Sequence, residues 1–266
     1  MPSRSRPALA NPVSRRTAAL RVRGLTKSFG AVLAVHPVDL TVERGSFYEL
    51  VGPNGAGKTT LMSMAVGLLR PDAGFSAVLG ADVWLDPRAA KSRMGVLPDG
   101  LALPERLTGR ELLTYVGQLR GIAPIDLNAR VDDLLELIDL AATERTLVVD
   151  YSTGMRKKIG LALALLPAPQ LLVLDEPFEA VDPVSAATLK AVLRRFVDAG
   201  STVVLSSHGM ATVEQLCDRV AVMADGAVVT EGPTEEVRGN RSLEEAFVDL
   251  VSNEPAEEAE LPWLLR

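Results

Sequence analysis

One short segment, residues 52–59, constrains the fold of this chain more than any other. Its sequence, Gly-Pro-Asn-Gly-Ala-Gly-Lys-Thr, has the spacing of a glycine-rich loop that binds phosphate. The apolar run Phe47–Val51 before it predicts a strand, and Leu61–Leu69 after it predicts a helix. A strand, a glycine-rich turn and a helix in this order are typical of α/β proteins that bind phosphate at a helix N-terminus.

The residue types in this loop indicate a nucleotide as the ligand. Glycines let successive backbone N–H groups point into one concavity, and the following helix adds partial positive charge. Lys58 is expected to reach the β- and γ-phosphates, and Thr59 to place its hydroxyl on Mg²⁺. A glycine-rich turn without a ligand needs neither residue. The predicted nucleotide-binding residues of the loop are Gly52, Pro53, Asn54, Gly55, Ala56, Gly57, Lys58, Thr59 and Thr60.

Two carboxylates end the apolar run Leu171–Leu174, which predicts a buried strand. Asp175 and Glu176 are costly at the edge of a sheet unless a cation or a chemical task requires them. We expect Asp175 to hold Mg²⁺ and Glu176 to take a proton from an attacking water. A strand that simply emerges into solvent explains the pair equally well when it is taken alone. The phosphate-binding loop upstream favours the functional interpretation.

The order of predicted elements gives the fold class. Strand and helix alternate around the loop and again after residue 152, which predicts a parallel α/β sheet. Residues 100–151 contain helical patterns at Arg110–Arg120 and Leu127–Leu140. Arg219–Met223 and Ala227–Thr230 flank an Asp-Gly turn and predict a hairpin. We therefore expect an α/β P-loop NTPase of the RecA-like type, with an N-terminal antiparallel β part and an inserted helical subdomain. The expected divisions are a disordered arm (1–18), the ATPase core (19–99 and 152–235), the helical subdomain (100–151), and a C-terminal helix and tail (236–266).

Composition narrows the compartment and the partners. The net charge is −6, and no acidic residue precedes Asp39, so the rest of the chain is still more acidic. We therefore expect no nucleic-acid partner. The single Cys217 excludes an intramolecular disulfide and fits a reducing compartment. The longest apolar stretch, Leu161–Leu174, is interrupted by prolines and is shorter than the ~20 apolar residues that cross a bilayer.

Together with Tyr151-Ser152-Thr153-Gly154-Met155 before a helix and His208 after a strand, these residues resemble the nucleotide-binding subunits of ABC transporters. The resemblance covers roughly residues 20–250. It implies ATP and Mg²⁺ as ligands, a second ATPase subunit in a homodimer, and a membrane permease as partner. It also implies a cytoplasmic protein that lies peripherally on the inner face of the cell membrane.

The resemblance assigns roles to further residues. Ser152 and Gly154 are expected to face the γ-phosphate of ATP held by the opposite subunit, and Asp182 to lie in the loop that links the two sites. His208 is expected to position the catalytic water, and Phe29 to lie against adenine. Each has a simpler alternative: Ser152 and Asp182 as helix N-caps, His208 as a structural histidine and Phe29 as a turn residue. Lys157, Lys158, Arg194 and Arg195 are interpreted as solvated helix faces.

The chain departs from the family pattern at several positions. Asp99 stands where the family has Gln, and its carboxylate could ligate Mg²⁺ but adds negative charge beside the phosphates. Thr153, Met155 and Ala180 also replace the usual residues. Because Asp175, Glu176 and His208 remain, we predict an active ATPase with Lys58, Glu176 and His208 as its catalytic residues.

The segment Tyr-Ser-Thr-Gly-Met together with Pro98-Asp99 is similar to the exporter branch of the family, whose permeases are separately encoded. The predicted function is therefore ATP hydrolysis that powers export of an unidentified substrate. Two alternatives stay open. One is an ABC-type ATPase that acts on ribosomes, DNA or iron–sulfur assembly, and the other is a regulatory module that binds ATP with weak hydrolysis.

Overall fold

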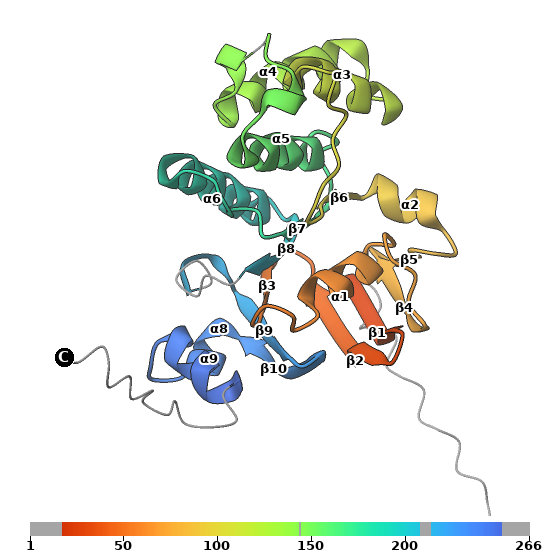
Figure 1. Ribbon diagram of the computed structural model, residues 1–266, viewed down its shortest axis with the longest axis vertical. Helices are drawn as coiled ribbons and strands as arrows, with labels where there is room; N and C mark the ends of the chain where they lie inside the picture. The colour runs from red at the N-terminus through yellow and green to blue at the C-terminus, as the bar shows by residue number, and fades with distance from the viewer. Residues whose placement is uncertain (1–17, 144, 208–213, 252–266) are drawn as a thin grey trace, which may run out of the picture.

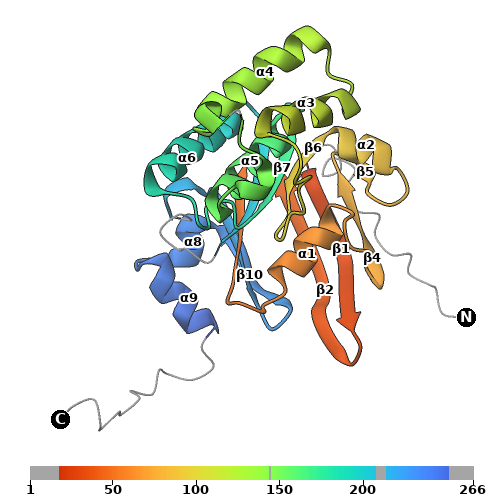
Figure 2. The ribbon, with the colours of Figure 1, turned by 45° about the horizontal axis from the view of Figure 1, so that its top comes forward.

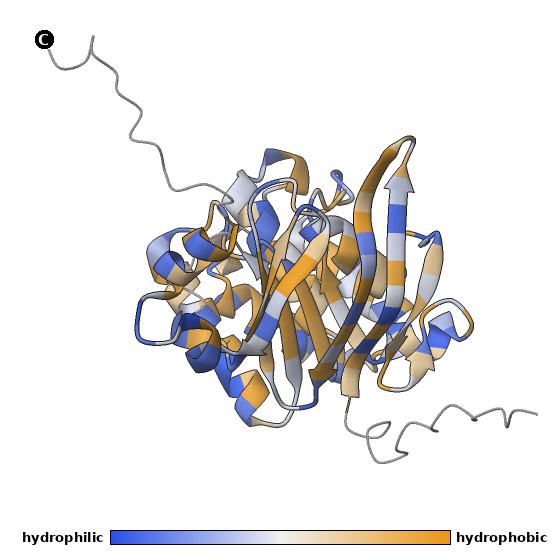
Figure 3. Ribbon diagram, turned by 90° about the horizontal axis from the view of Figure 1, so that it is seen from below, coloured by the Kyte–Doolittle hydropathy of each residue, from blue (hydrophilic) through white to orange (hydrophobic). Residues whose placement is uncertain are grey.

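The computed structural model describes residues 18–143, 145–207 and 214–251, and a six-stranded sheet forms the centre of this part (Figure 1). Its strand order is β10-β9-β3-β8-β7-β6, parallel except for the edge strand β10. The strands are β3 (Phe47–Val51), β6 (Met94–Leu97), β7 (Leu171–Asp175), β8 (Thr202–Ser207), β9 (Arg219–Ala224) and β10 (Ala227–Pro233). Every residue of β3, β7 and β8 is buried, as expected for parallel strands that are covered on both faces. Figure 3 shows that the strands at the centre of the molecule are largely hydrophobic.

A second, antiparallel sheet of four strands lies beside the first, in the order β2-β1-β4-β5 (Figure 1). Its strands are β1 (Ala18–Phe29), β2 (Val32–Glu43), β4 (Ala73–Val78) and β5 (Ala81–Asp82). This sheet is the predicted N-terminal antiparallel part. Strand β1 begins at Ala18, which was expected to end the disordered arm. The rest of that arm lies outside the described residues.

The helices cover both faces of the central sheet. Helix α1 lies between the two sheets, and α3, α4 and α5 gather at the opposite side (Figures 1 and 2). The helices are α1 (Lys58–Ala65), α2 (Pro87–Ser92), α3 (Gly109–Leu119), α4 (Pro124–Leu137), α5 (Thr153–Leu165), α6 (Pro183–Asp198), α8 (Thr234–Arg238) and α9 (Leu243–Val251). Two short 3₁₀ turns occupy Ala141–Thr143 and Val148–Asp150. The predicted α/β fold class is confirmed, and no helix among the described residues is long and apolar enough to cross a bilayer.

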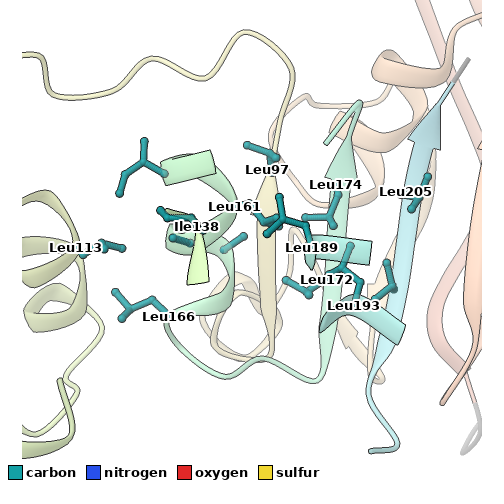
Figure 4. Packing of buried hydrophobic residues seen from close by; sticks show 14 of the residues in the cluster. Leu97, Leu113, Ile138, Leu161, Leu166, Leu172, Leu174, Leu189, Leu193 and Leu205 are labelled. Carbon is teal, nitrogen blue, oxygen red and sulfur yellow. The ribbon is translucent and has the colours of Figure 1, made fainter. Parts of the chain in front are cut away.

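Alternation along the central strands divides the hydrophobic core into two clusters. In β7, Leu172 and Leu174 point to one face of the sheet, and Leu171 and Val173 point to the other. The first face packs against α5 and α6, and Figure 4 shows Leu161, Leu189 and Leu193 from these helices beside Leu172 and Leu174. The second face packs against α1 and the antiparallel sheet. The sheet is therefore held rigidly from both sides, which fixes the loops at its carboxyl edge.

Local sequence explains where several elements begin. Asp182 caps α6 by accepting a hydrogen bond from the Ser185 N–H at 2.9 Å, and Pro183 occupies the first helical position. Between β9 and β10, Asp225 and Gly226 both have positive φ angles, 47° and 77°, as a tight hairpin turn requires. The predicted hairpin is therefore confirmed.

Some boundaries differ from prediction. Helix α1 begins at Lys58, earlier than the expected Leu61, because Gly57 serves as its N-cap. It ends at Ala65, before the expected Leu69. Helix α4 begins at Pro124, three residues before the expected start. The expected boundary at residue 236 falls inside α8. Strands β4, β5 and β6, helix α2 and the two 3₁₀ turns were not anticipated. The described C-terminal part contains two helices, α8 and α9, where one was expected.

Candidate nucleotide-binding site

A cavity of about 470 Å³ opens where the glycine-rich loop meets the carboxyl end of β7. Its size is in the range of ~300–1,000 Å³ that small-molecule sites occupy. The described residues that line it come from four separate segments of the chain, so only the folded protein brings them together. They are Ala34, Asn54, Gly55, Ala56, Gly57, Lys58, Thr59, Thr60, Asp99, Glu176 and Glu179.

The glycine-rich loop is shaped by backbone geometry that only glycine adopts easily. Gly57 is the N-cap of α1 with φ = 96°, and a Cβ atom there would lie 2.7 Å from the carbonyl oxygen of Ala34. The first turn of α1, which is described in full, contains no acidic residue. The helix N-terminus therefore presents its partial positive charge to the cavity without a carboxylate of its own.

Lys58 is held inside the loop rather than in solvent. Its Nζ donates to the carbonyl oxygen of Gly52 at 2.7 Å and to that of Pro53 at 3.1 Å, and the residue is 7% exposed. Burial lowers the pKa of the Lys58 ammonium, while the nearby Glu176 and Asp175 act to raise it. The loop thus supplies a desolvated cation beside its own N–H groups, which suits an anionic ligand.

The carboxylates at the end of β7 are fixed by a residue of the neighbouring strand. Asp175, only 3% exposed, lies opposite Ser206 in the parallel register of β7 and β8. The Ser206 hydroxyl donates to Oδ1 of Asp175 and accepts from the N–H of Glu176 at 3.1 Å. Glu176 has φ = 46°, so the chain turns sharply as it leaves the strand. Ser206 was not predicted from sequence. The signal for it was the parallel pairing of the two predicted strands, which brings a residue at the end of the second strand opposite Asp175.

The interpretation of Lys157 and Lys158 as solvated residues is wrong. The Lys157 side chain is 12% exposed, and its Nζ donates to the carbonyl oxygen of Asp175 at 3.2 Å. The same atom lies 3.7 Å from Oδ1 of Asp99 and 3.9 Å from Oε2 of Glu179. Lys158 is 7% exposed and pairs with Asp182 at 3.1 Å. Both ammonium groups are directed to acidic side chains because α5 lies against the loops that follow β6 and β7.

Arg194 is partly solvated, with its side chain 42% exposed, but it also forms ion pairs. Its guanidinium lies 3.1 Å from Asp198 and 2.9 Å from Asp218, so it joins α6 to the segment before β9. Hydrogen bonding to Asp218, the largest cause, raises its pKa. Arg195 is exposed, in agreement with the interpretation.

Ser152, Gly154 and Asp182 lie together but are not among the described residues that line the cavity. Ser152 is exposed and caps α5 by accepting from the Met155 N–H at 3.2 Å. A Cβ atom on Gly154 would lie 2.4 Å from the carbonyl oxygen of Ala180, so the start of α5 packs on the loop before α6. Hydrogen bonding to Ser185, with a further contribution from Lys158, holds the pKa of Asp182 well below its usual range. These contacts fix the start of α5, with Ser152 and Gly154, at the surface of its own chain.

Further predicted residues, Gly52, Pro53, Asp175 and Phe29, are also not among the described residues that line the cavity. Phe29 is 52% exposed at the end of β1, with Lys27 Nζ 5.6 Å from its ring centre, and it is not among the described lining residues. His208 lies outside the described residues. Ala34 and Glu179 line the cavity without having been predicted.

The oxygen atoms near the cavity are of the type that Mg²⁺ prefers. Thr59 and Asp99 line the cavity and Asp175 lies next to it, which provides hydroxyl and carboxylate oxygens. In the described part of the chain no group of three or more His, Cys, Asp or Glu side chains could hold a metal ion. Mg²⁺ is commonly bound by one or two carboxylates with substrate phosphates completing the set, so a sparse donor set of this kind suits it.

Comparisons with known proteins agree with this site. The family model described as "ABC transporter" matches residues 35–179. The chain is 41% identical over 220 residues to "Daunorubicin resistance ATP-binding protein DrrA3" of Streptomyces coeruleorubidus, covering 83% of this chain and 70% of that protein. It is 37% identical over 214 residues to "Nod factor export ATP-binding protein I" of Rhizobium sp. (strain N33), covering 80% and 70%.

A solved structure described as "Structure of ATP binding subunit of ABC transporter" superposes with a TM-score of 0.82 at 28% identity, covering 87% of this chain and 99% of that one. The family match spans more than half of the chain and includes the glycine-rich loop and the Asp175–Glu176 pair. The chain therefore belongs to the ABC transporter family, as an ATP-binding and ATP-hydrolysing subunit.

Proposed function

We propose that the chain hydrolyses ATP in this cavity and thereby powers export of a substrate through a separate membrane permease. The observation that supports this most strongly is the meeting of three groups in one cavity: the loop around Lys58, the hydroxyl of Thr59 and the carboxylate of Glu176. The loop and α1 bind and orient the phosphates, and Glu176 accepts a proton from the attacking water. Little covalent chemistry is needed, because positioning and charge stabilisation account for most of phosphoryl transfer.

The residue roles follow from the positions of the side chains. Lys58 leaves the Gly52 and Pro53 carbonyls to contact the β- and γ-phosphates. The backbone N–H of Glu176 donates to Ser206, which holds the residue at the cavity wall, and its carboxylate orients the attacking water. We propose that His208 positions this water. We also propose that Phe29 contacts the adenine ring of the bound nucleotide.

We propose Mg²⁺ as the metal, held by Thr59 and Asp175, with Asp99 as a further ligand. When bound, Mg²⁺ would neutralise the negative charge of the β- and γ-phosphates. The burial of Asp175 and its bond from Ser206 keep one carboxylate oxygen fixed, and the other is available to the metal.

We also propose a head-to-tail dimer of two copies. Ser152 and Gly154 lie at the N-terminus of α5, which has no acidic residue in its first turn. Its partial positive charge and exposed Ser152 hydroxyl suit a γ-phosphate supplied from outside this chain. Asp182, fixed by Ser185 and Lys158, lies beside this surface and would connect the two sites.

Export is proposed from the names of two relatives, which describe drug resistance and Nod factor export. Neither cargo is transferred to this chain, because cargo contacts of such systems lie on the permease. A peripheral position on the cytoplasmic face of the cell membrane, against that permease, is part of the same proposal.

The test is co-purification from membranes of the native host. Tagged wild type is compared with Glu176→Gln, which should bind ATP but stall before hydrolysis, and with Glu244→Gln, the same change on an exposed face of α9. We expect all three to recover one polytopic membrane protein, and only Glu176→Gln to retain ATP. Recovery of ribosomal or DNA-repair proteins without a membrane partner would contradict the transport proposal.

A further inference from the structure

Three consecutive cations, Arg156, Lys157 and Lys158, lie near the N-terminus of α5. This end of a helix carries partial positive charge and favours acidic side chains, yet the first turn of α5 contains none. The three cations therefore do not serve the helix itself. Arg156 donates to the carbonyls of Tyr151 and Val149, and Lys158 pairs with Asp182. Each of these two fixes a segment outside the cavity.

Lys157 differs because its ammonium lies beside two acidic residues that line the nucleotide cavity. Its side chain is 12% exposed, so its charge must be balanced by nearby groups. The balancing groups are Asp99 at 3.7 Å and Glu179 at 3.9 Å, and both carboxylates line the cavity. A hydrogen bond to the carbonyl of Asp175 at 3.2 Å fixes the ammonium to the end of β7.

The charge of the cavity shows why this cation matters. Among the described lining residues, Lys58 is opposed by the three carboxylates of Asp99, Glu176 and Glu179. A triphosphate remains anionic even with its metal ion, so these three carboxylates act against its binding by the loop and Lys58. Lys157 lies just behind two of these carboxylates and offsets their charge. Lys157 also connects α5 to the loops after β6 and β7, and so it restrains both carboxylates at the cavity wall.

We propose that Lys157 is a positioning residue of the nucleotide site, which neutralises Asp99 and Glu179 together so that a cavity with three carboxylates accepts Mg-ATP. This inference rests on the proposed function of the cavity. It concerns a residue that acts through its two acidic neighbours and does not itself touch the nucleotide.

The experiment measures the dissociation constant of Mg-bound trinitrophenyl-ATP for wild type, Lys157→Met, Lys157→Arg and Lys91→Met. Lys157→Met keeps most of the aliphatic side chain and removes the charge. We expect the variant to bind the nucleotide about tenfold more weakly, because the charges of Asp99 and Glu179 then oppose the phosphates without compensation. Lys157→Arg should bind within about twofold of wild type because charge is the decisive property. Lys91→Met makes the same charge change on the exposed end of α2 and should leave binding unchanged.

Rescue distinguishes charge balance from a merely structural role. Adding Glu179→Gln to Lys157→Met removes one uncompensated carboxylate. The double variant should therefore bind the nucleotide at least about threefold more tightly than Lys157→Met alone. The defect of Lys157→Met should also shrink as salt is raised, because Asp99 and Glu179 are half exposed and screened by ions. If Lys157→Met does not fold, Glu179→Gln alone provides the measurement, with binding expected to become about twofold tighter.

The inference would be overturned if Lys157→Met bound the nucleotide as tightly as wild type, or if the double variant bound it no more tightly than Lys157→Met. Either result would leave the proposed function intact. For Glu179→Gln alone, unchanged or weaker binding would overturn it in the same way. A wild-type chain that fails to bind the nucleotide would contradict the proposed function as well.

Discussion

The hydroxyl of Ser206 donates a hydrogen bond to the carboxylate of Asp175, across the paired ends of β8 and β7. The same hydroxyl accepts from the N–H of Glu176, so one side chain orients both acidic residues at the cavity edge. Because Asp175 is almost fully buried, loss of this partner would leave a buried carboxylate oxygen without its hydrogen-bond donor.

Ser206→Ala should therefore impair ATP hydrolysis more than it impairs folding. We expect the rate of phosphate release to fall by about tenfold or more, because Asp175 and Glu176 lose a shared anchor. The free energy of unfolding should fall by about 1–3 kcal/mol. Steady-state phosphate release and urea unfolding measure the two effects.

Ser76→Ala is the matched control for this prediction. Ser76 is also fully buried, and its hydroxyl donates to the carbonyl of Ala65 at 2.7 Å, away from the cavity. It should lower stability by a similar amount without a comparable loss of hydrolysis per folded molecule. Equal loss of activity in both variants would mean that Ser206 has only a structural role.

Gly154→Ala tests the contact between α5 and the loop before α6. The added Cβ would lie 2.4 Å from the carbonyl oxygen of Ala180, so this loop must move. Because Gly154 does not line the cavity, nucleotide binding by the monomer should stay within about threefold, while hydrolysis should fall at least about tenfold. Gly232→Ala is the control, since its Cβ would meet Val237 at an ordinary 3.4 Å. Normal hydrolysis by Gly154→Ala would show that this contact is not needed.

The buried Glu49 predicts a pH dependence of stability. It lies on β3 with no exposed surface and accepts a hydrogen bond from the Cys217 thiol at 2.9 Å. Burial, the largest cause, raises its pKa from 4.5 to about 8. Between these two values the folded chain keeps a proton that the unfolded chain releases. This group therefore makes the free energy of unfolding fall as pH rises through that window, and the effect levels off above about pH 8.

Glu49→Gln removes this titration while keeping the shape of the side chain. The variant should show a smaller loss of stability between pH 5 and pH 9, and at pH 9 it should exceed wild type by at least about 1 kcal/mol. Urea unfolding at several pH values measures this difference. Glu244→Gln, at an exposed position of α9, should follow the wild-type pH profile. Parallel profiles for wild type and Glu49→Gln would contradict the buried-acid interpretation.

Much of the fold could be predicted because the chain's local signals agree with its tertiary structure. The runs Phe47–Val51 and Leu171–Leu174 are long and apolar enough to indicate buried strands, and Asp182-Pro183 marks a helix start. By contrast, β4 has the sequence Ala-Gly-Phe-Ser-Ala-Val, which does not alternate cleanly between apolar and polar residues. It becomes a strand because it pairs with β1, a contact between distant segments.

The charged residues around the cavity were harder to predict. Lys157 looks like any lysine on a helix face, since its two carboxylate neighbours come from loops 58 residues before it and 22 residues after it in the sequence. Glu49 lies inside an apolar run, and the local pattern does not predict which groups surround its carboxyl group in the core. Such environments depend on how loops and sheets converge, which local patterns do not encode.

The measurement that tests the central claim most directly is phosphate release by Glu176→Gln compared with wild type, alongside ATP binding by both. Glu176 lines the cavity and has the only proposed role in accepting the proton of the attacking water. We predict that the variant binds ATP with an affinity close to that of wild type and releases phosphate at less than about 1% of the wild-type rate. Hydrolysis at the wild-type rate by Glu176→Gln would contradict the account, because the reaction would then not depend on this carboxylate.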